Sequence, residues 1–135
     1  MKKAFTLLAL LFSMTAGILA QDVEIKKDAV KIDGETICLI SDDKDNRGSF
    51  FIDDLTGSHL IYMKWIFYPD LNYYEIYDAD DLDTPLCEEE AVNGFRKQIM
   101  RKLYVAEVIS PKGLDPKALT NYADGVGKTF SPRKK

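Results

Sequence analysis

The fold is decided by residues 58–68, which read Ser58-His59-Leu60-Ile61-Tyr62-Met63-Lys64-Trp65-Ile66-Phe67-Tyr68. β-Branched and aromatic residues fill this stretch almost without a break, a composition typical of a strand that is packed on both sides. Successive side chains of a strand point to opposite faces. We therefore expect the central strand of an antiparallel sheet. One face carries Ile61, Met63, Trp65 and Phe67, and the other carries Leu60, Tyr62, Ile66 and Tyr68.

Shorter stretches of the same kind lie on either side of this strand. Asp33-Gly34 suits a two-residue hairpin turn, because glycine takes a positive φ at no steric cost. Pro69 ends the central strand, since it has no N–H for the ladder. The even spacing of turn signals predicts an antiparallel meander. We expect its other strands at residues 23–26, 29–32, 36–40, 49–53 and 73–77.

After Asp78 the apolar residues take the three-and-four spacing of a helix face. Asp83 or Thr84 can cap this helix, and Glu88-Glu89-Glu90 would lie near the positive end of its dipole. A second helix is predicted over residues 117–123, where Asp115-Pro116 provides a cap and a first turn. The predicted fold class is therefore α+β: an antiparallel β-meander of five or six short strands with two C-terminal helices packed on one face. The apolar face of the first helix comprises Ala91, Val92, Phe95, Ile99, Met100 and Leu103.

The first twenty residues have the pattern of a secretory signal peptide. Lys2 and Lys3 precede a short apolar run, and Ala20 stands before the expected cleavage site. We expect 1–20 to be a signal peptide, 21–127 a single domain and 128–135 a flexible basic tail. The mature protein would then be periplasmic or secreted, without a membrane span.

The charge balance argues against polyanionic partners. Removal of residues 1–20 takes two of the 18 basic residues and leaves all 22 acidic ones, so the net charge changes from −4 to −6. A nucleic acid is therefore not expected as a partner.

Cys38 and Cys87 are the only cysteines. An even count in an exported domain favours a disulfide. However, Cys38 lies in the apolar run of residues 37–40, where a buried free thiol behaves as a small hydrophobe. The sequence leaves both alternatives open.

The mature chain resembles an uncharacterised family of small exported, signal-peptide-bearing bacterial proteins to which no activity is assigned. The resemblance rests on the opening residues 22–27, the Ile32-Asp33-Gly34 turn, and residues 51–57 that lead into the aromatic strand. It extends to residues 103–109 and 113–119. It implies export and a single small domain, and it transfers no catalytic or binding residue.

Metal and catalytic chemistry find weak support in the residues. His59 is the only histidine, and its neighbour Ser58 points to the opposite strand face, so a hydrolase would need another serine beside His59. One histidine and two separated cysteines do not match a zinc motif. Calcium is the better metal candidate, because Asp43, Asp45 and Asp54 occupy positions that resemble an oxygen-ligand loop. Arg47 replaces one ligand of that loop, however.

The strongest functional indication is a cluster of tyrosines in two adjacent strands. If the helices cover the sheet face that carries Ile61, Met63, Trp65 and Phe67, the tyrosines lie on the other face. We then expect them to form a recognition surface for a protein or a glycan. The alternative is that the rings pack against each other as sheet-stabilising pairs. We predict a non-enzymatic binding domain, with a calcium-stabilised structural domain or a small hydrolase as the alternatives. The expected binding surface comprises Tyr62, Tyr68, Tyr73, Tyr77 and Glu75.

Overall fold

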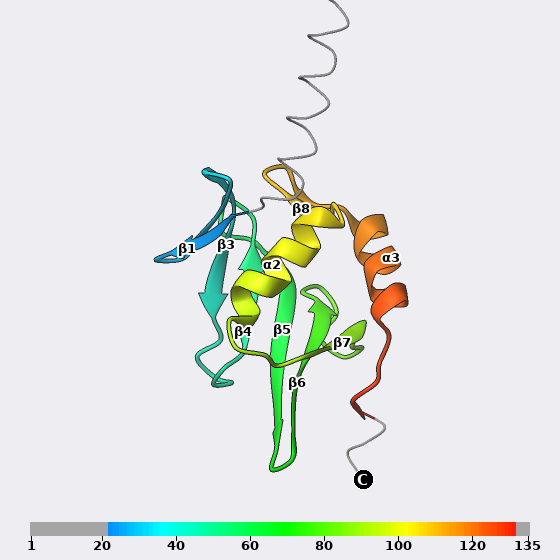
Figure 1. Ribbon diagram of the computed structural model, residues 1–135. Coiled ribbons are helices and arrows are strands. Elements are labelled where there is room, and N and C mark those ends of the chain that lie inside the picture. Colours follow the sequence, from blue (N-terminus) through cyan, green and yellow to red (C-terminus); the bar gives the residue numbers. More distant parts are fainter. Residues whose placement is uncertain (1–21, 132–135) are drawn as a thin grey trace, which may run out of the picture.

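The computed structural model describes residues 22–131, and seven of its strands form one antiparallel sheet (Figure 1). Each strand pairs with the one before it in the chain, so the sheet is a continuous meander. The strands are β1 (Val23–Lys26), β2 (Ala29–Ile32), β3 (Glu35–Asp42), β4 (Phe50–Asp53), β5 (His59–Tyr68), β6 (Leu71–Asp78) and β7 (Cys87–Glu90).

Two-residue turns set the register of this sheet. Asp33 and Gly34 have φ values of 52° and 86°, the positive angles that a tight hairpin turn requires, and they place Ile32 opposite Glu35. Pro69 and Asp70 connect β5 to β6 and place Tyr68 opposite Leu71. The longest strand, β5, lies between β4 and β6 as the fifth strand of seven.

The predicted fold class is wrong in its strands and in the placement of its helices. The sheet has seven strands instead of five or six, a second sheet contains β8 (Ile109–Ser110) and β9 (Gly113–Leu114), and the structure of residues 22–131 is mostly β. Cys87–Glu90, which the sequence assigns to a helix, is strand β7. Tertiary pairing overrides the local helix signal here, since Cys87 lies opposite Ile76 and Glu90 lies opposite Tyr73.

The two helices have different positions. α2 (Phe95–Val105) crosses one face of the sheet (Figure 1) and begins after Gly94, without a side-chain cap. α3 (Pro116–Val126) packs beside β7 at the edge of the sheet. Its first turn is capped by Asp115, whose Oδ1 accepts hydrogen bonds from the N–H groups of Lys117 and Ala118 at 3.1 and 3.2 Å.

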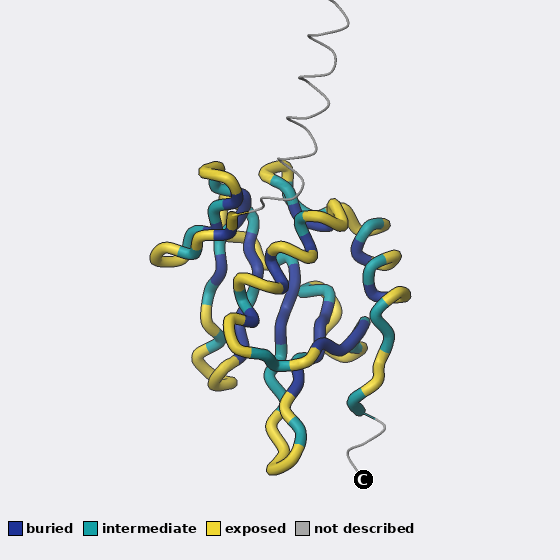
Figure 2. The backbone as a smooth tube through the Cα atoms, in the orientation of Figure 1, coloured by how far each residue is buried: buried dark blue, intermediate teal, exposed yellow. Residues whose placement is uncertain are grey.

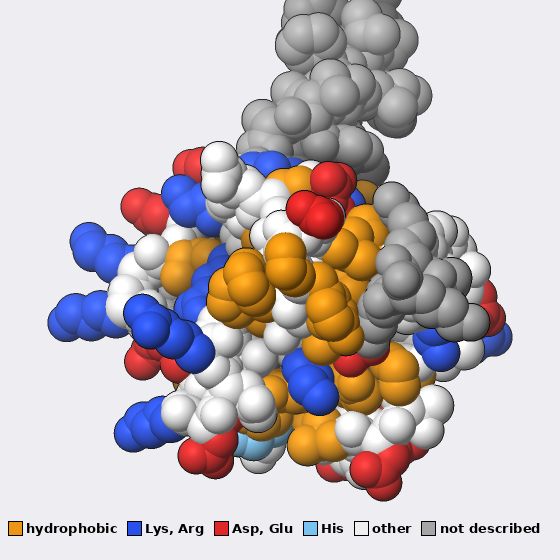
Figure 3. All heavy atoms as spheres, turned by 90° about the horizontal axis from the view of Figure 1, so that it is seen from below, with side chains coloured by type: hydrophobic (Ala, Val, Ile, Leu, Met, Phe, Trp, Pro, Cys, Tyr) orange, Lys and Arg blue, Asp and Glu red, His pale blue; other side chains and the backbone are white. Residues whose placement is uncertain are grey.

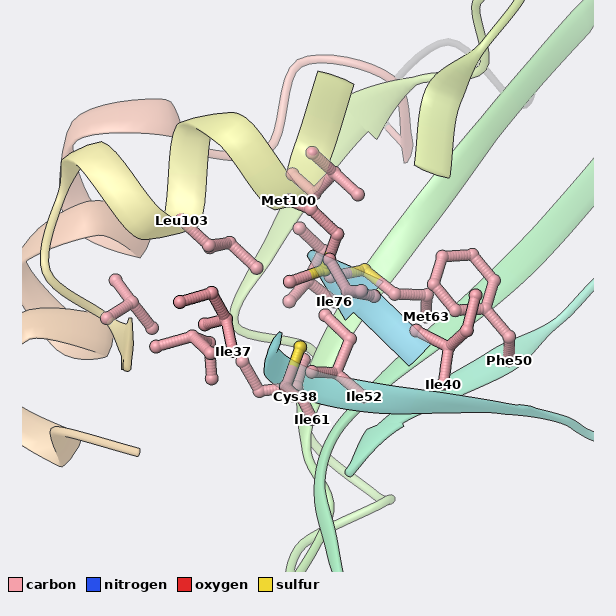
Figure 4. Close-up of a cluster of buried hydrophobic side chains, with 14 of the residues drawn as sticks. Ile37, Cys38, Ile40, Phe50, Ile52, Ile61, Met63, Ile76, Met100 and Leu103 are labelled. Atoms are coloured by element: carbon pink, nitrogen blue, oxygen red, sulfur yellow. The ribbon is translucent and has the colours of Figure 1, made fainter. Parts of the chain in front are cut away.

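The hydrophobic core lies between α2 and the face of the sheet that it covers (Figure 4). Figure 2 shows buried backbone concentrated in the middle strands, with exposed positions at the turns. Opposed pairs such as Phe50 with Met63 and Ile52 with Ile61 point into this core. The central buried side chains are Ile37, Cys38, Ile40, Phe50, Ile52, Ile61, Met63, Ile76, Met100 and Leu103.

Within residues 22–131, neither helix is long and apolar enough to cross a membrane. The predicted signal peptide, 1–20, lies outside the described residues. Residues 128–131 of the expected flexible tail lie against β7, and residues 132–135 are outside the described part of the chain.

Candidate functional site

The structure does not form the tyrosine surface that the sequence suggests. Tyr62, Tyr73 and Tyr77 do lie on the sheet face away from α2, but all three side chains are buried, as is Glu75. Only Tyr68 is exposed, with 39% of its surface accessible. Four of the five predicted binding residues are therefore not available to a partner in this conformation.

Two of the buried tyrosine hydroxyls, those of Tyr62 and Tyr77, bind carboxylates of the same chain. Tyr62 donates to Asp43 at 2.5 Å, and Tyr77 donates to Glu75 at 2.8 Å. Burial, and then the hydrogen bond to Asp43, raise the pKa of Tyr62 above its ordinary value. Burial and Glu75 raise the pKa of Tyr77 in the same way. Phe51 and Tyr62 are packed with ring centroids 4.6 Å apart. These rings stabilise the sheet through cross-strand pairs.

His59 forms a pair with a buried carboxylate rather than with a serine. Its Nδ1 lies 2.6 Å from Oδ1 of Asp53, and its ring stacks on Phe51 with a centroid distance of 3.8 Å. A β-bulge between Ile52 and Asp53 shifts the register at this point. The hydroxyl of Ser41 donates to Asp53 Oδ2 at 2.7 Å. Ser41 therefore meets the carboxylate of the pair and not the imidazole.

The β5–β6 hairpin projects beyond the rest of the sheet (Figure 1). β4 pairs with β5 only as far as Met63, and β7 pairs with β6 only from Tyr73, so residues 64–72 pair with no strand outside the hairpin. We call these residues the hairpin tip. Phe67 is 64% exposed and Tyr68 is 39% exposed, the two largest aromatic exposures among the described hydrophobic residues. From below, Figure 3 shows hydrophobic side chains across the middle of the molecule and Lys and Arg side chains along one side.

Trp65 connects this tip to the body of the protein. Its main-chain N–H donates to the hydroxyl of Ser49 at 2.9 Å, and its ring centroid lies 5.6 Å from that of Phe67. The ring also lies directly over Gly48, where a Cβ atom would be 2.4 Å from Cε3 of the indole. Gly48 has a φ of +89°, which favours glycine independently. The loop before β4 thus forms a flat seat for Trp65.

A second aromatic contact stiffens the stem of the hairpin. Tyr74 lies opposite Trp65 in the sheet and stacks on Phe95 of α2, with centroids 4.0 Å apart and ring planes 8° apart. Its hydroxyl donates to the carbonyl of Gly48 at 3.3 Å. The tip is therefore anchored both to α2 and to the loop before β4.

Two of the three carboxylates of the suggested calcium loop, those of Asp43 and Asp54, accept hydrogen bonds from other groups of the chain. Asp43 accepts hydrogen bonds from Tyr62, Asn46 and the N–H of Asp45. The hydrogen bonds from Tyr62 and then Asn46 hold the pKa of the Asp43 carboxyl below its usual range. Asp54 closes a separate turn by accepting from Thr56 and Ser58. Within residues 22–131, no group of three or more His, Cys, Asp or Glu side chains is arranged to hold a metal ion.

Cys38 and Cys87 are free thiols, and both are buried in the core. They lie on β3 and β7, which are separated in the sheet by β4, β5 and β6. Burial, followed by the negative charge of nearby carboxylates, raises the pKa of each thiol to about 12. The sequence leaves open a disulfide or two free thiols, and the structure contains two free thiols that pack as small hydrophobic side chains.

The edge of the sheet formed by β7 carries buried carboxylates. Glu89 Oε2 lies 3.3 Å from the Lys102 ammonium group, and its Oε1 accepts from the Tyr122 hydroxyl at 3.2 Å. Burial and Glu89 raise the pKa of Tyr122. A cavity of about 220 Å³ lies beside these groups, between β7, α2 and the chain that follows α3. A wider surface groove of about 760 Å³ lies between the end of α2 and β9, with Tyr104, Val105 and Leu114 in its wall.

No family model matches the chain, and no curated protein or solved structure matches it either. The site therefore rests on its own geometry. Sequence reasoning missed Phe67 as a surface residue, because it placed Phe67 on the face that the helices cover. The lengths of the strands contain the missing signal: residues 49–53 are too short to pair with all of residues 58–68, so part of the longer strand had to project.

Proposed function

We propose that this protein is an exported, non-enzymatic binding domain that contacts a macromolecular partner, a protein or a glycan, with the hairpin tip. The observation that carries the proposal is the concentration of exposed aromatic rings on a hairpin that extends past its neighbouring strands. Burying a side chain such as Phe67 in a partner would contribute roughly 1.5–3 kcal/mol. Aromatic residues are also enriched among the residues that dominate binding energy.

The contacts at the base of the hairpin support the same proposal. The seat under Trp65 and the stacking of Tyr74 on Phe95 fix the stem of the hairpin before any partner arrives. A pre-organised surface loses less conformational entropy on binding, so more of its contact energy appears as affinity. The export part of the proposal rests on residues 1–20 of the sequence alone.

The test compares two double variants in a capture experiment. Phe67→Ser/Tyr68→Ser removes the exposed rings of the tip. Leu82→Ser/Val105→Ser is the matched control, because these side chains are 49% and 62% exposed and lie outside the hairpin tip. Each protein is crosslinked to envelope fractions of its source cells. We expect a partner that the wild type and the control capture and that the tip variant loses.

Trp65 gives a direct second measurement, because it is the only tryptophan and lies at the base of the tip. Its emission should shift when an envelope fraction is added. Prior protease digestion of the fraction should abolish the shift for a protein partner and preserve it for a glycan. Equal capture by the tip variant, with no emission change in the wild type, would contradict the proposed function.

A further inference from the structure

The chain that follows α3 lies along β7, the last strand of the sheet. We call residues 127–131 the strap. Gly127, with a φ of 76°, turns the chain out of the helix, and its carbonyl accepts a hydrogen bond from the N–H of Glu88 at 3.0 Å. The N–H groups of Phe130 and Ser131 both donate to Oε1 of Glu88 at 2.8 Å. The side chain of Glu88 is thereby held in a buried position, with its residue only 2% exposed.

The strap also places one ring on the sheet. The ring of Phe130 stacks on Tyr73 of β6, with centroids 5.4 Å apart and ring planes 12° apart. Tyr73 is completely buried in this arrangement. The strap is thus seated by main-chain hydrogen bonds to Glu88 and by one aromatic stack.

A segment of another protein could make the same contacts as the strap. The three hydrogen bonds between Glu88 and the strap all involve main-chain groups of the strap, and any extended segment can offer such groups. Addition of an extended segment to a sheet edge is a common mode of peptide recognition, in which main-chain hydrogen bonds give affinity and side-chain pockets give specificity. The cavity of about 220 Å³ beside β7 provides room for a further side chain.

We propose that the edge of β7, with Glu88 and Tyr73, is a docking site for an extended segment of a partner protein that carries an aromatic residue and basic residues near it. The strap occupies this site within the same chain and competes with the partner. The basic character of the occupant follows from charge, because Glu88 and Glu90 lie on the same face of β7, whereas the strap contains Lys128. This site adjoins the hairpin tip, since Tyr73 lies opposite Ile66, but the proposal does not depend on the function of the tip.

The test uses the full-length chain and a fluorescent synthetic peptide with the sequence of residues 126–135. In the wild type the strap is tethered beside its seat, and a tether of this length acts as a competitor at an effective concentration in the millimolar range. Phe130→Ala removes the stacking ring and weakens that competitor. We expect the peptide to bind the variant at least about tenfold more tightly than it binds the wild type, by fluorescence anisotropy. Equal affinity for the two proteins, or no binding to either, would overturn the proposal.

Three further measurements make the result specific. A peptide with alanine in place of the phenylalanine should lose its preference for the Phe130→Ala protein, and retention of that preference would contradict recognition by Tyr73. Ser131→Pro removes one N–H that Glu88 accepts while the ring of Phe130 stays, so it weakens the strap by a different route. Ser131→Pro should also bind the peptide more tightly than the wild type does. It therefore tests the proposal independently if Phe130→Ala does not fold. Phe67→Ser/Tyr68→Ser should bind the peptide as the wild type does.

Discussion

The position of the Trp65 side chain depends on the absence of a side chain at Gly48. Its backbone has a φ of +89°, and the indole of Trp65 lies where a Cβ atom would project. Gly57 has nearly the same conformation, with a φ of +92°, but no atom lies within 4 Å of its hypothetical Cβ. The two glycines therefore separate the effect of backbone strain from the effect of the close contact.

Gly48→Ala should destabilise the protein more than Gly57→Ala does. Both substitutions introduce strain at a positive φ, and only the first forces Trp65 from its seat, which adds roughly 1–3 kcal/mol of overpacking. Urea unfolding measures the free energies, and the emission of Trp65 should shift to longer wavelength in Gly48→Ala alone. Equal losses of stability, with unchanged emission, would show that the seat does not hold the ring.

At the scale of elements, local signals and tertiary pairing compete. α3 follows its local sequence, because Asp115 and Pro116 specify a helix start whatever packs around them. Glu88-Glu89-Glu90 carries a local signal of similar strength for a helix, yet β6 offers these residues a ladder and they form β7. The capping residues can be recognised in the sequence, but the free edge of β6 exists only in the folded sheet. For the same reason α2 begins at Phe95 rather than near Thr84.

The cap of α3 predicts a measurable loss. Asp115→Ala removes the oxygen that accepts the N–H groups of Lys117 and Ala118, and it should destabilise the protein by about 1 kcal/mol. Asp115→Ser, which keeps a capping oxygen, should retain most of that stability in the same thermal or urea unfolding experiment. If serine and alanine have equal effects, the hydrogen bonds of the cap contribute nothing.

At the scale of the whole molecule, the protonated thiols of the core limit the stability of the protein at high pH. The folded protein keeps Cys38 and Cys87 protonated up to a pKa of about 12, whereas the unfolded chain releases these protons near pH 9. The unfolded state therefore binds fewer protons above pH 9, and stability falls as the pH rises. Each thiol should reduce the free energy of unfolding by roughly 1 kcal/mol per pH unit across this window.

Urea unfolding at pH values from 8 to 11 measures this slope. Cys38→Ala/Cys87→Ala is the matched variant: it is less stable at pH 8, but its slope should be shallower than that of the wild type. Tyr62, Tyr74, Tyr77 and Tyr122 also have raised pKa values, chiefly because of burial, so a part of the slope should remain in the variant. Identical slopes would mean that the thiols are accessible to hydroxide in the folded state.

The sequence predicts the strands well where turns bracket them, as at Asp33-Gly34 and Pro69. It cannot show which face of a strand is covered, because that depends on how far the neighbouring strands extend. Tyr62 and Tyr77 were expected at the surface and are buried against acidic side chains, whereas Phe67 was expected in the core and is exposed. Composition identifies the aromatic hairpin as unusual, but only the register of the full sheet separates its buried stem from its tip.

The order of the strands has a consequence for how the protein folds. Every pairing in the sheet joins neighbours along the chain, so each hairpin can close over a short loop as soon as both of its strands are free. Proteins rich in such local contacts fold faster than those that must first bring distant segments together. The contacts of α2 with β1 and of β8 with β3 join segments that are far apart in the chain. The sheet can therefore grow in sequence order, and the segments that follow it, α2 first, then cover its apolar face and complete the core.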